Sequence, residues 1–151
     1  MILVAFWHGL RASEVTQLTP DAIQDGKLIV ARLKGSNRTM QDLVWHENPL
    51  LNERDALIAH AARTPRNQRL FKIGRQHFWT LIQKYGELAG LPQHKRHPHV
   101  LKHTIAMQSI HSAGIEHVRQ YLGHKSISST GAYLKVSDDD AARAVRGAVK
   151  L

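Results

Sequence analysis

Strand character is confined to one stretch of the chain, and helical patterns lie on both sides of it. Residues 27–33 are largely apolar and include the β-branched Ile29 and Val30, while residues 34–37 have the composition of a turn. Residues 39–45 alternate in part between apolar and polar side chains and are expected to form the returning strand. These features predict a mostly helical α+β domain with a small antiparallel sheet near its N-terminal side, either a hairpin or part of a three-stranded sheet.

Helical periodicity is clearest in residues 74–89, where apolar side chains recur at three- and four-residue spacings. Further helices are predicted over residues 2–8, 14–18, 49–63, 100–113, 116–122, 126–134 and 141–150. The helix at residues 49–63 is expected to present an apolar side made of Leu50, Leu51, Leu57, Ile58 and Ala61. We expect the larger aromatic side chains to lie in the core: Trp7, Trp45, Trp79, Tyr85 and Tyr121. The alternative for a tryptophan is a platform on which a base stacks.

The charge of the chain favours a polyanionic partner. Its 151 residues, enough for one domain with a sizeable core, carry 21 Lys and Arg against 12 Asp and Glu, a formal net charge of +9. Nucleic acid is therefore the first candidate partner, and a basic surface kept for solubility is the alternative. The apolar run at residues 1–7 is too short to span a membrane, and no long basic amphipathic helix indicates membrane binding.

Three short motifs contain the residues that we consider for chemistry. Residues 9–14 read Gly-Leu-Arg-Ala-Ser-Glu, residues 99–104 read His-Val-Leu-Lys-His-Thr, and residues 122–124 read Leu-Gly-His, with Tyr133 nine positions after His124. A phenol is a poor nucleophile near neutral pH because its pKa is about 10. It becomes effective when cationic groups stabilise the charge that develops on a phosphate under attack, so the question is whether the chain supplies those cations.

Arg11 and Glu14 are three positions apart, so the carboxylate can hold the guanidinium on the same side of a helix. A guanidinium held in this way is oriented to bind two phosphate oxygens; the alternative is a surface ion pair worth under about 1 kcal/mol. His99 and His103 are one helical turn apart, a spacing that also fits two zinc ligands. Because the chain has no cysteine and no acid near these histidines, we expect no metal site.

In their residues and order, these motifs resemble those of the tyrosine recombinases, also called phage-type integrases. The resemblance implies that residues 1–151 form the catalytic domain of such a protein, with its DNA-clamping domain placed before this chain. It also implies that Tyr133 is the nucleophile, that Arg11 is the first catalytic arginine, and that Glu14 supports Arg11. By the same resemblance, His99 is the active-site imidazole that contacts the scissile phosphate, and His103 is a more structural histidine.

Two further site residues follow from the resemblance. His124 is placed to hydrogen-bond the phosphate or to assist Tyr133. Lys34, in the predicted β-turn, contacts DNA and protonates the leaving oxygen, and its neighbours Arg32 and Arg38 are candidate phosphate contacts.

Lys102 is the one departure from the family pattern, which has an arginine at this position. Lysine keeps the positive charge but loses the fork that binds two oxygens. Two functions therefore remain open. One is site-specific cleavage and rejoining of DNA through a 3′-phosphotyrosine, without a cofactor; the other is a degenerate, non-catalytic DNA-binding module.

The resemblance also implies how such a protein assembles. We expect a monomer in solution and a homotetramer on paired sites in double-stranded DNA, with the C-terminal helix passed to the next subunit. The alternative is that this helix folds back on its own domain. The lack of cysteine is compatible with a reducing cytosol, and the resemblance implies a cytoplasmic, nucleoid-associated protein of bacterial or phage origin, acting in DNA integration or on a mobile element.

Overall fold

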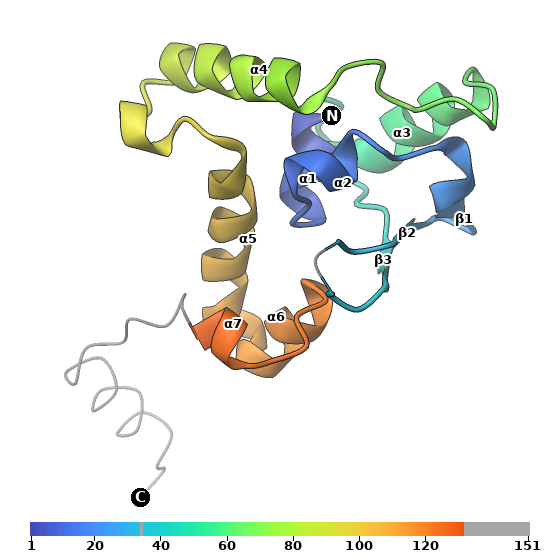
Figure 1. The fold of residues 1–151 in the computed structure, drawn as a ribbon. Helices are drawn as coiled ribbons and strands as arrows, with labels where there is room; N and C mark the ends of the chain where they lie inside the picture. The colour runs from blue at the N-terminus through green and yellow to red at the C-terminus, as the bar shows by residue number, and fades with distance from the viewer. Residues whose placement is uncertain (34, 132–151) are drawn as a thin grey trace, which may run out of the picture.

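The computed structural model describes residues 1–33 and 35–131, and these form a mostly helical α+β domain (Figure 1). The helices are α1 (Ile2–Trp7), α2 (Ala12–Val15), α3 (Glu53–Ala62), α4 (Arg75–Leu88), α5 (Pro98–Ala113), α6 (Ile115–Tyr121) and α7 (Ser128–Gly131), with 3-10 turns η1 (Pro20–Ala22) and η2 (Gln93–Lys95). The strands are β1 (Ile23–Gln24), β2 (Lys27–Val30) and β3 (Thr39–Asp42). The predicted fold class is confirmed. None of the described helices is long and apolar enough to cross a membrane.

The sheet is the three-stranded alternative, with strand order β1-β2-β3 and antiparallel pairing throughout. In the β2–β3 ladder, Leu28 lies opposite Gln41 and Val30 lies opposite Thr39, and all four residues are buried. This one-sided burial follows from the alternation of side chains along a strand. Both long strands are shorter than predicted, and β2 ends at Val30 instead of residue 33.

The core consists of two clusters on either side of the polar centre of the domain. The larger cluster joins α1, α2, the sheet, α3 and α4 and includes Val4, Leu10, Val15, Leu28, Leu57 and Phe78. The smaller one lies between α5 and α6 and consists of Ala106, Ile110, Val118 and Leu122, with Tyr121 packed against it. Helix α5 contacts both α1 and α6, so it connects the two clusters (Figure 1).

Several residues predicted in the core lie on the surface. Helix α3 begins only at Glu53, where the Asn52 side chain accepts the Asp55 amide at 3.2 Å, so Leu50 precedes the helix and is 85 % exposed. Helix α4 buries only the narrow stripe of Phe78, Ile82 and Gly86. The predictions were therefore wrong for these residues, which are at least 40 % exposed: Trp45, Leu50, Leu51, Ile58, Trp79 and Tyr85.

Gly123 joins the end of α6 to the turn between β2 and β3. Its φ is +70°, a left-handed value that favours glycine, and its carbonyl accepts the Asn37 amide at 2.8 Å. A Cβ at this position lies 2.6 Å from the Asn37 carbonyl oxygen. The approach of these two segments therefore depends on the absence of a side chain at residue 123.

Replacement of Gly123 by alanine is expected to lower the free energy of unfolding by about 2–5 kcal/mol, because left-handed strain and a backbone clash combine. Gly90 is the matched control, since its φ is also +70° but a Cβ there meets nothing within 4 Å. Gly90→Ala should cost only the strain, about 1–2 kcal/mol. Urea denaturation of both variants measures the difference, and equal losses would show that the turn moves away from residue 123 at little cost.

Candidate active site

The three sequence motifs meet in one cavity of about 430 Å³. Its walls come from the turn before α2, the β2–β3 turn, α5 and the segment around α7. The lining residues are Arg11, Gly35, Ser36, His99, Lys102, His124, Lys125, Ser126 and Ser129. Four of the six residues predicted as catalytic thus lie together, although they are up to 113 positions apart in the sequence (124 − 11).

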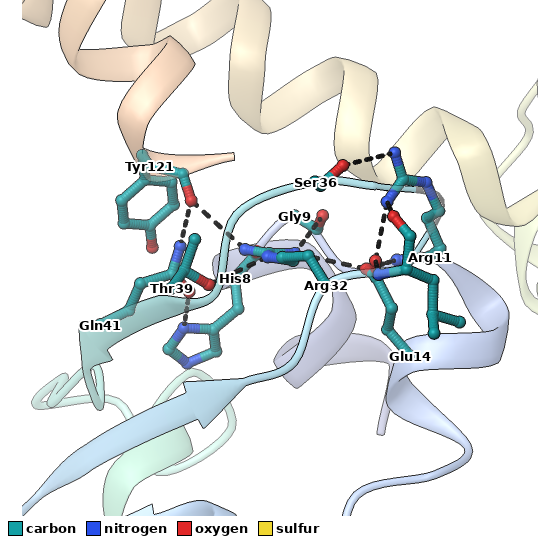
Figure 2. Close-up of polar contacts among 10 residues, drawn as sticks. His8, Gly9, Arg11, Glu14, Arg32, Ser36, Thr39, Gln41 and Tyr121 are labelled. Carbon is teal, nitrogen blue, oxygen red and sulfur yellow. Dashed lines mark hydrogen bonds and ion pairs between the residues drawn. The ribbon is translucent and has the colours of Figure 1, made fainter. Parts of the chain in front are cut away.

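The expected ion pair between Arg11 and Glu14 is present and is partly buried. Arg11 Nη1 donates to Glu14 Oε1 at 2.7 Å and to the Leu33 carbonyl at 3.2 Å, and the Arg11 amide donates to Glu14 Oε2 at 2.7 Å (Figure 2). The Glu14 side chain is fully buried, whereas that of Arg11 is 18 % exposed. The carboxylate therefore holds the guanidinium at the edge of the cavity, where one face remains open.

Arg32 lies behind this pair, and the expectation that it contacts DNA is corrected. Its side chain is fully buried. Its Nη2 donates to the carbonyl of His8 at 2.8 Å, its Nη1 to the carbonyl of Gly9 at 3.1 Å, and its Nε to Thr39 Oγ1 at 2.9 Å (Figure 2). Since these donors already have partners inside the domain, Arg32 connects the Arg11 turn to the sheet. Arg38, in the β2–β3 turn, is exposed and stays a candidate DNA contact.

Glu14 is ionised in spite of its burial. Burial alone opposes the charged form, but hydrogen bonds from the amides of Arg11 and Leu33, together with the charge of Arg32, outweigh it and lower the pKa of Glu14. The amide of Leu33 donates to Glu14 Oε1 at 3.1 Å, and Arg32 Nη1 lies 3.3 Å from Oε2. One carboxylate thus holds two guanidiniums and two backbone amides.

Lys102 lies on α5 with its side chain turned into the protein. The residue is 4 % exposed, and its Nζ has no hydrogen-bond partner among the described residues. Burial, together with the charges of Arg11 and Arg32, lowers the pKa of Lys102 to about 7, while Glu14 opposes the shift. The cation that replaces the family's arginine is therefore present in the cavity but poised between its charged and neutral forms.

The three motif histidines differ in exposure. His124 is buried and its Nδ1 lies 2.9 Å from Thr130 Oγ1; burial, followed by the charges of Lys102 and Arg11, lowers its pKa to about 4. His99 and His103 are exposed on the first turns of α5, and burial and their cationic neighbours lower the pKa of each. Within residues 1–33 and 35–131, no three His, Cys, Asp or Glu side chains gather as metal ligands.

Two predicted catalytic residues, Lys34 and Tyr133, lie outside the described residues. The described residues next to them are Leu33, Gly35 and Gly131. Gly35 lines the cavity, and Gly131 ends α7. The predicted helix at residues 141–150 also lies outside the described part of the chain.

A second groove, of about 700 Å³, opens beside the first and was not expected from the sequence. It shares Arg11 and His99 with the cavity, and α4 supplies Arg75, Gln76 and Trp79 to its wall. Arg75 and Trp79 are one helical turn apart and outside the buried stripe of α4. That spacing, which sets a basic residue beside an exposed aromatic ring, is the signal that could have identified them.

Comparisons with known proteins identify the family of this chain. Residues 1–140 match the model of the phage integrase family. Tyrosine recombinase XerD of Yersinia pestis is 32 % identical over 149 residues, which cover 92 % of this chain and 50 % of that protein. The chain spans about half the length of the curated relatives it matches.

Solved structures give the same fold. The crystal structure of XerA recombinase aligns with a TM-score of 0.74 at 22 % identity, covering 98 % of this chain and 57 % of that one. XerH recombinase, solved as a pre-cleavage complex with its difH substrate, aligns with a TM-score of 0.68 at 21 % identity. The alignment covers 93 % of this chain and 43 % of that one. The match to the family model over residues 1–140 shows that the chain belongs to the phage integrase family of tyrosine recombinases.

Replacement of Arg32 by alanine is expected to lower the free energy of unfolding by about 3–5 kcal/mol, because Glu14 stays buried with one cation fewer and main-chain carbonyls lose their donor. Arg38→Ala, six positions away on the surface, should change it by no more than about 0.5 kcal/mol. Chemical denaturation of the two variants makes the comparison. A stable Arg32→Ala protein would contradict the assignment of Arg32 to the interior.

Proposed function

We propose that this chain cleaves and rejoins DNA strands at specific sites through a 3′-phosphotyrosine intermediate. The observation that carries the proposal is the convergence of Arg11, His99, Lys102 and His124 on one cavity. Donors grouped in this way, in a partly water-excluded site, are suited to the charge that develops on a phosphate under attack. Membership of the phage integrase family supports the same reaction.

In the proposed reaction, the Tyr133 oxygen attacks the scissile phosphorus. A bond forms between that oxygen and phosphorus while the phenolic proton passes to solvent, the bond to the 5′ oxygen breaks, and Lys34 supplies the proton that the leaving oxygen takes up. Arg11, held by Glu14, binds the non-bridging oxygens, and Lys102 and His124 donate to the same group. Rejoining reverses these steps, so the phosphotyrosine conserves the bond energy and no cofactor is required.

The second candidate is a DNA-binding module without cleavage activity. Lys102 favours it, because a lysine with a pKa of about 7 is a weaker and more conditional phosphate ligand than a bidentate arginine. The two functions differ in one measurable property. Only the enzyme forms a covalent bond to DNA, whereas both bind DNA.

The DNA itself is proposed to run across the cavity and the neighbouring groove. Arg75 and Gln76 are suited to contacts with phosphates or bases, and the exposed ring of Trp79 offers an apolar surface to a sugar or base. Arg38 extends the basic surface on the other side of the cavity. The net charge of +9 supports such a path along a polyanion.

We further propose that residues 1–151 act as the catalytic domain of a two-domain recombinase, whose DNA-clamping domain adds most of the affinity. The length of the relatives, about twice that of the matched segment, supports this. Assembly is proposed to be a monomer in solution and a homotetramer on paired DNA sites. Residues 141–151 are the segment proposed to pass between subunits.

Tyr133→Phe is expected to abolish covalent attachment to DNA while leaving non-covalent binding nearly unchanged, because only the phenolic oxygen is lost. The substrate is a pool of nicked suicide duplexes with randomised sequence around the nick, from which protein–DNA complexes that survive detergent are recovered and sequenced. Tyr85→Phe, at an exposed tyrosine outside the cavity, is the matched control and should retain attachment. A covalent complex formed by the Tyr133 variant would remove this residue as the nucleophile.

Deletion of residues 141–151 is expected to impair pairing of two DNA sites more than binding to one site, because the proposed exchange acts only between subunits. Native gel electrophoresis with one-site and two-site duplexes recovered from the trapping pool separates the two effects. Thermal denaturation of the shortened chain is the control. An unfolded or insoluble product would assign the segment to the core of its own domain.

A further inference from the structure

Lys102 lies in the cavity with no hydrogen-bond partner for its ammonium group among the described residues. Its Nζ is buried and accepts or donates no hydrogen bond there. An ammonium carries three N–H donors, and burial without an acceptor disfavours the charged form strongly. Arg11, by contrast, keeps its guanidinium paired with Glu14 and partly open to solvent.

The groups around Lys102 add to this preference for the neutral amine. Charged or titratable side chains face it from four sides: Arg11 and Glu14 from α2 and its preceding turn, Arg32 from the segment after β2, His124 and Lys125 from the segment before α7, and His99 and His103 from α5 itself. Glu14 is the single acid in this set, and four donors already engage its two oxygens. The surroundings are therefore cationic, and they repel a further positive charge.

We propose that the phosphate site of this chain is proton-linked: above neutral pH, Lys102 is a neutral amine in the free protein and binds one proton when a phosphate group enters the cavity. The inference rests on the proposed function, in which that phosphate belongs to DNA. A phosphodiester brings one negative charge and two oxygens that accept hydrogen bonds. It supplies the counter-charge and the acceptor that the buried amine needs in order to become an ammonium.

The direction of the pH dependence follows from this linkage. The pKa of Lys102 in the free protein is lowered to about 7 by burial and by Arg11 and Arg32, and a bound anion raises it. Below pH 7 the Lys102 amine is already protonated in the free protein, so phosphate binding takes up few protons. As pH rises from about 7 toward the pKa of the bound state, affinity falls by up to about tenfold per pH unit for one linked proton. An arginine at this position stays charged throughout and shows no such fall.

The protonation state of the free protein can be measured directly. Protein labelled with ¹³C at lysine is titrated by NMR, and the Lys102→Met variant identifies the Lys102 signal among those of the nine lysines. The expected midpoint is near 7, and it should rise by one unit or more with sulfate, a dianion that does not itself titrate in this range. A free-protein midpoint near the ordinary value of 10.5 overturns the proposal.

Binding to DNA provides the second measurement. Titration calorimetry of a 20-base-pair duplex at pH 8, in two buffers of different ionisation enthalpy, counts the protons taken up; about one is expected for the natural chain and none for Lys102→Arg. Equal uptake by the two proteins overturns the proposal, as does a Lys102 midpoint that neither sulfate nor the duplex raises. Thermal denaturation of the variants confirms that they are folded.

These outcomes are independent of strand cleavage. Proton uptake is measured on a non-covalent complex, so it persists in Tyr133→Phe. A chain that takes up the proton but forms no covalent complex supports the proton-linked site and removes the enzymatic function. A chain that cleaves DNA without proton uptake supports the enzymatic function and removes the proton-linked site.

Discussion

The buried carboxylate of Glu14 is the interaction on which the site depends. Its two oxygens receive four donors: the guanidiniums of Arg11 and Arg32 and the backbone amides of Arg11 and Leu33. Removal of one partner from such a group leaves a buried charge uncompensated, which costs far more than the loss of a surface pair. The turn at Arg11 and the segment after β2 are therefore fixed relative to each other, and with them the direction of the guanidinium.

The charge around Glu14 is unbalanced in a way that suits an anion. Arg11 and Arg32 together carry two positive charges against the one negative charge of Glu14, so this group of described residues is net cationic even when Lys102 is neutral. A protonated Lys102 increases this excess within a region of low dielectric constant, where repulsion is strong. The same excess attracts a phosphodiester. Charge that disfavours one form of the free protein thus favours the binding of a phosphate group.

Local patterns predicted the helices of the described residues, the β2–β3 hairpin and the three motifs, because each depends on neighbours within a few residues. The position of Arg32 depends instead on distant main-chain atoms. It follows a strand and precedes a basic turn, as a DNA contact does, but its Nη2 also donates to the Tyr121 carbonyl, 89 residues away. The burial of Lys102 and the exposure of Trp79 have the same origin. Side chains on α4 and α5 are covered or left open by elements that no local window contains.

The buried side chain of Gln41 explains how the end of α6, which leads to His124, is held. The Tyr121 carbonyl ends α6, three residues before His124, and accepts the Gln41 side-chain amide at 2.6 Å. Since a carbonyl only accepts, the Gln41 NH₂ group faces it and Gln41 Oε1 faces His8, whose Nδ1 lies 2.7 Å away and must donate.

The other ring nitrogen of His8 lies 2.6 Å from Oε1 of the buried Glu53 carboxylate. Reversal of the Gln41 amide would set its oxygen against the Tyr121 carbonyl, two acceptors face to face, so this side chain has one orientation that satisfies both neighbours. Buried polar groups of this kind add little net stability, but they allow fewer alternative packings than apolar side chains do. The end of α6 is therefore held by directional bonds to the sheet, while the apolar cluster on its other side supplies the stabilising contact area. The proposed function, in which His124 and Arg11 bind the same phosphate, requires that directional restraint more than it requires additional stability.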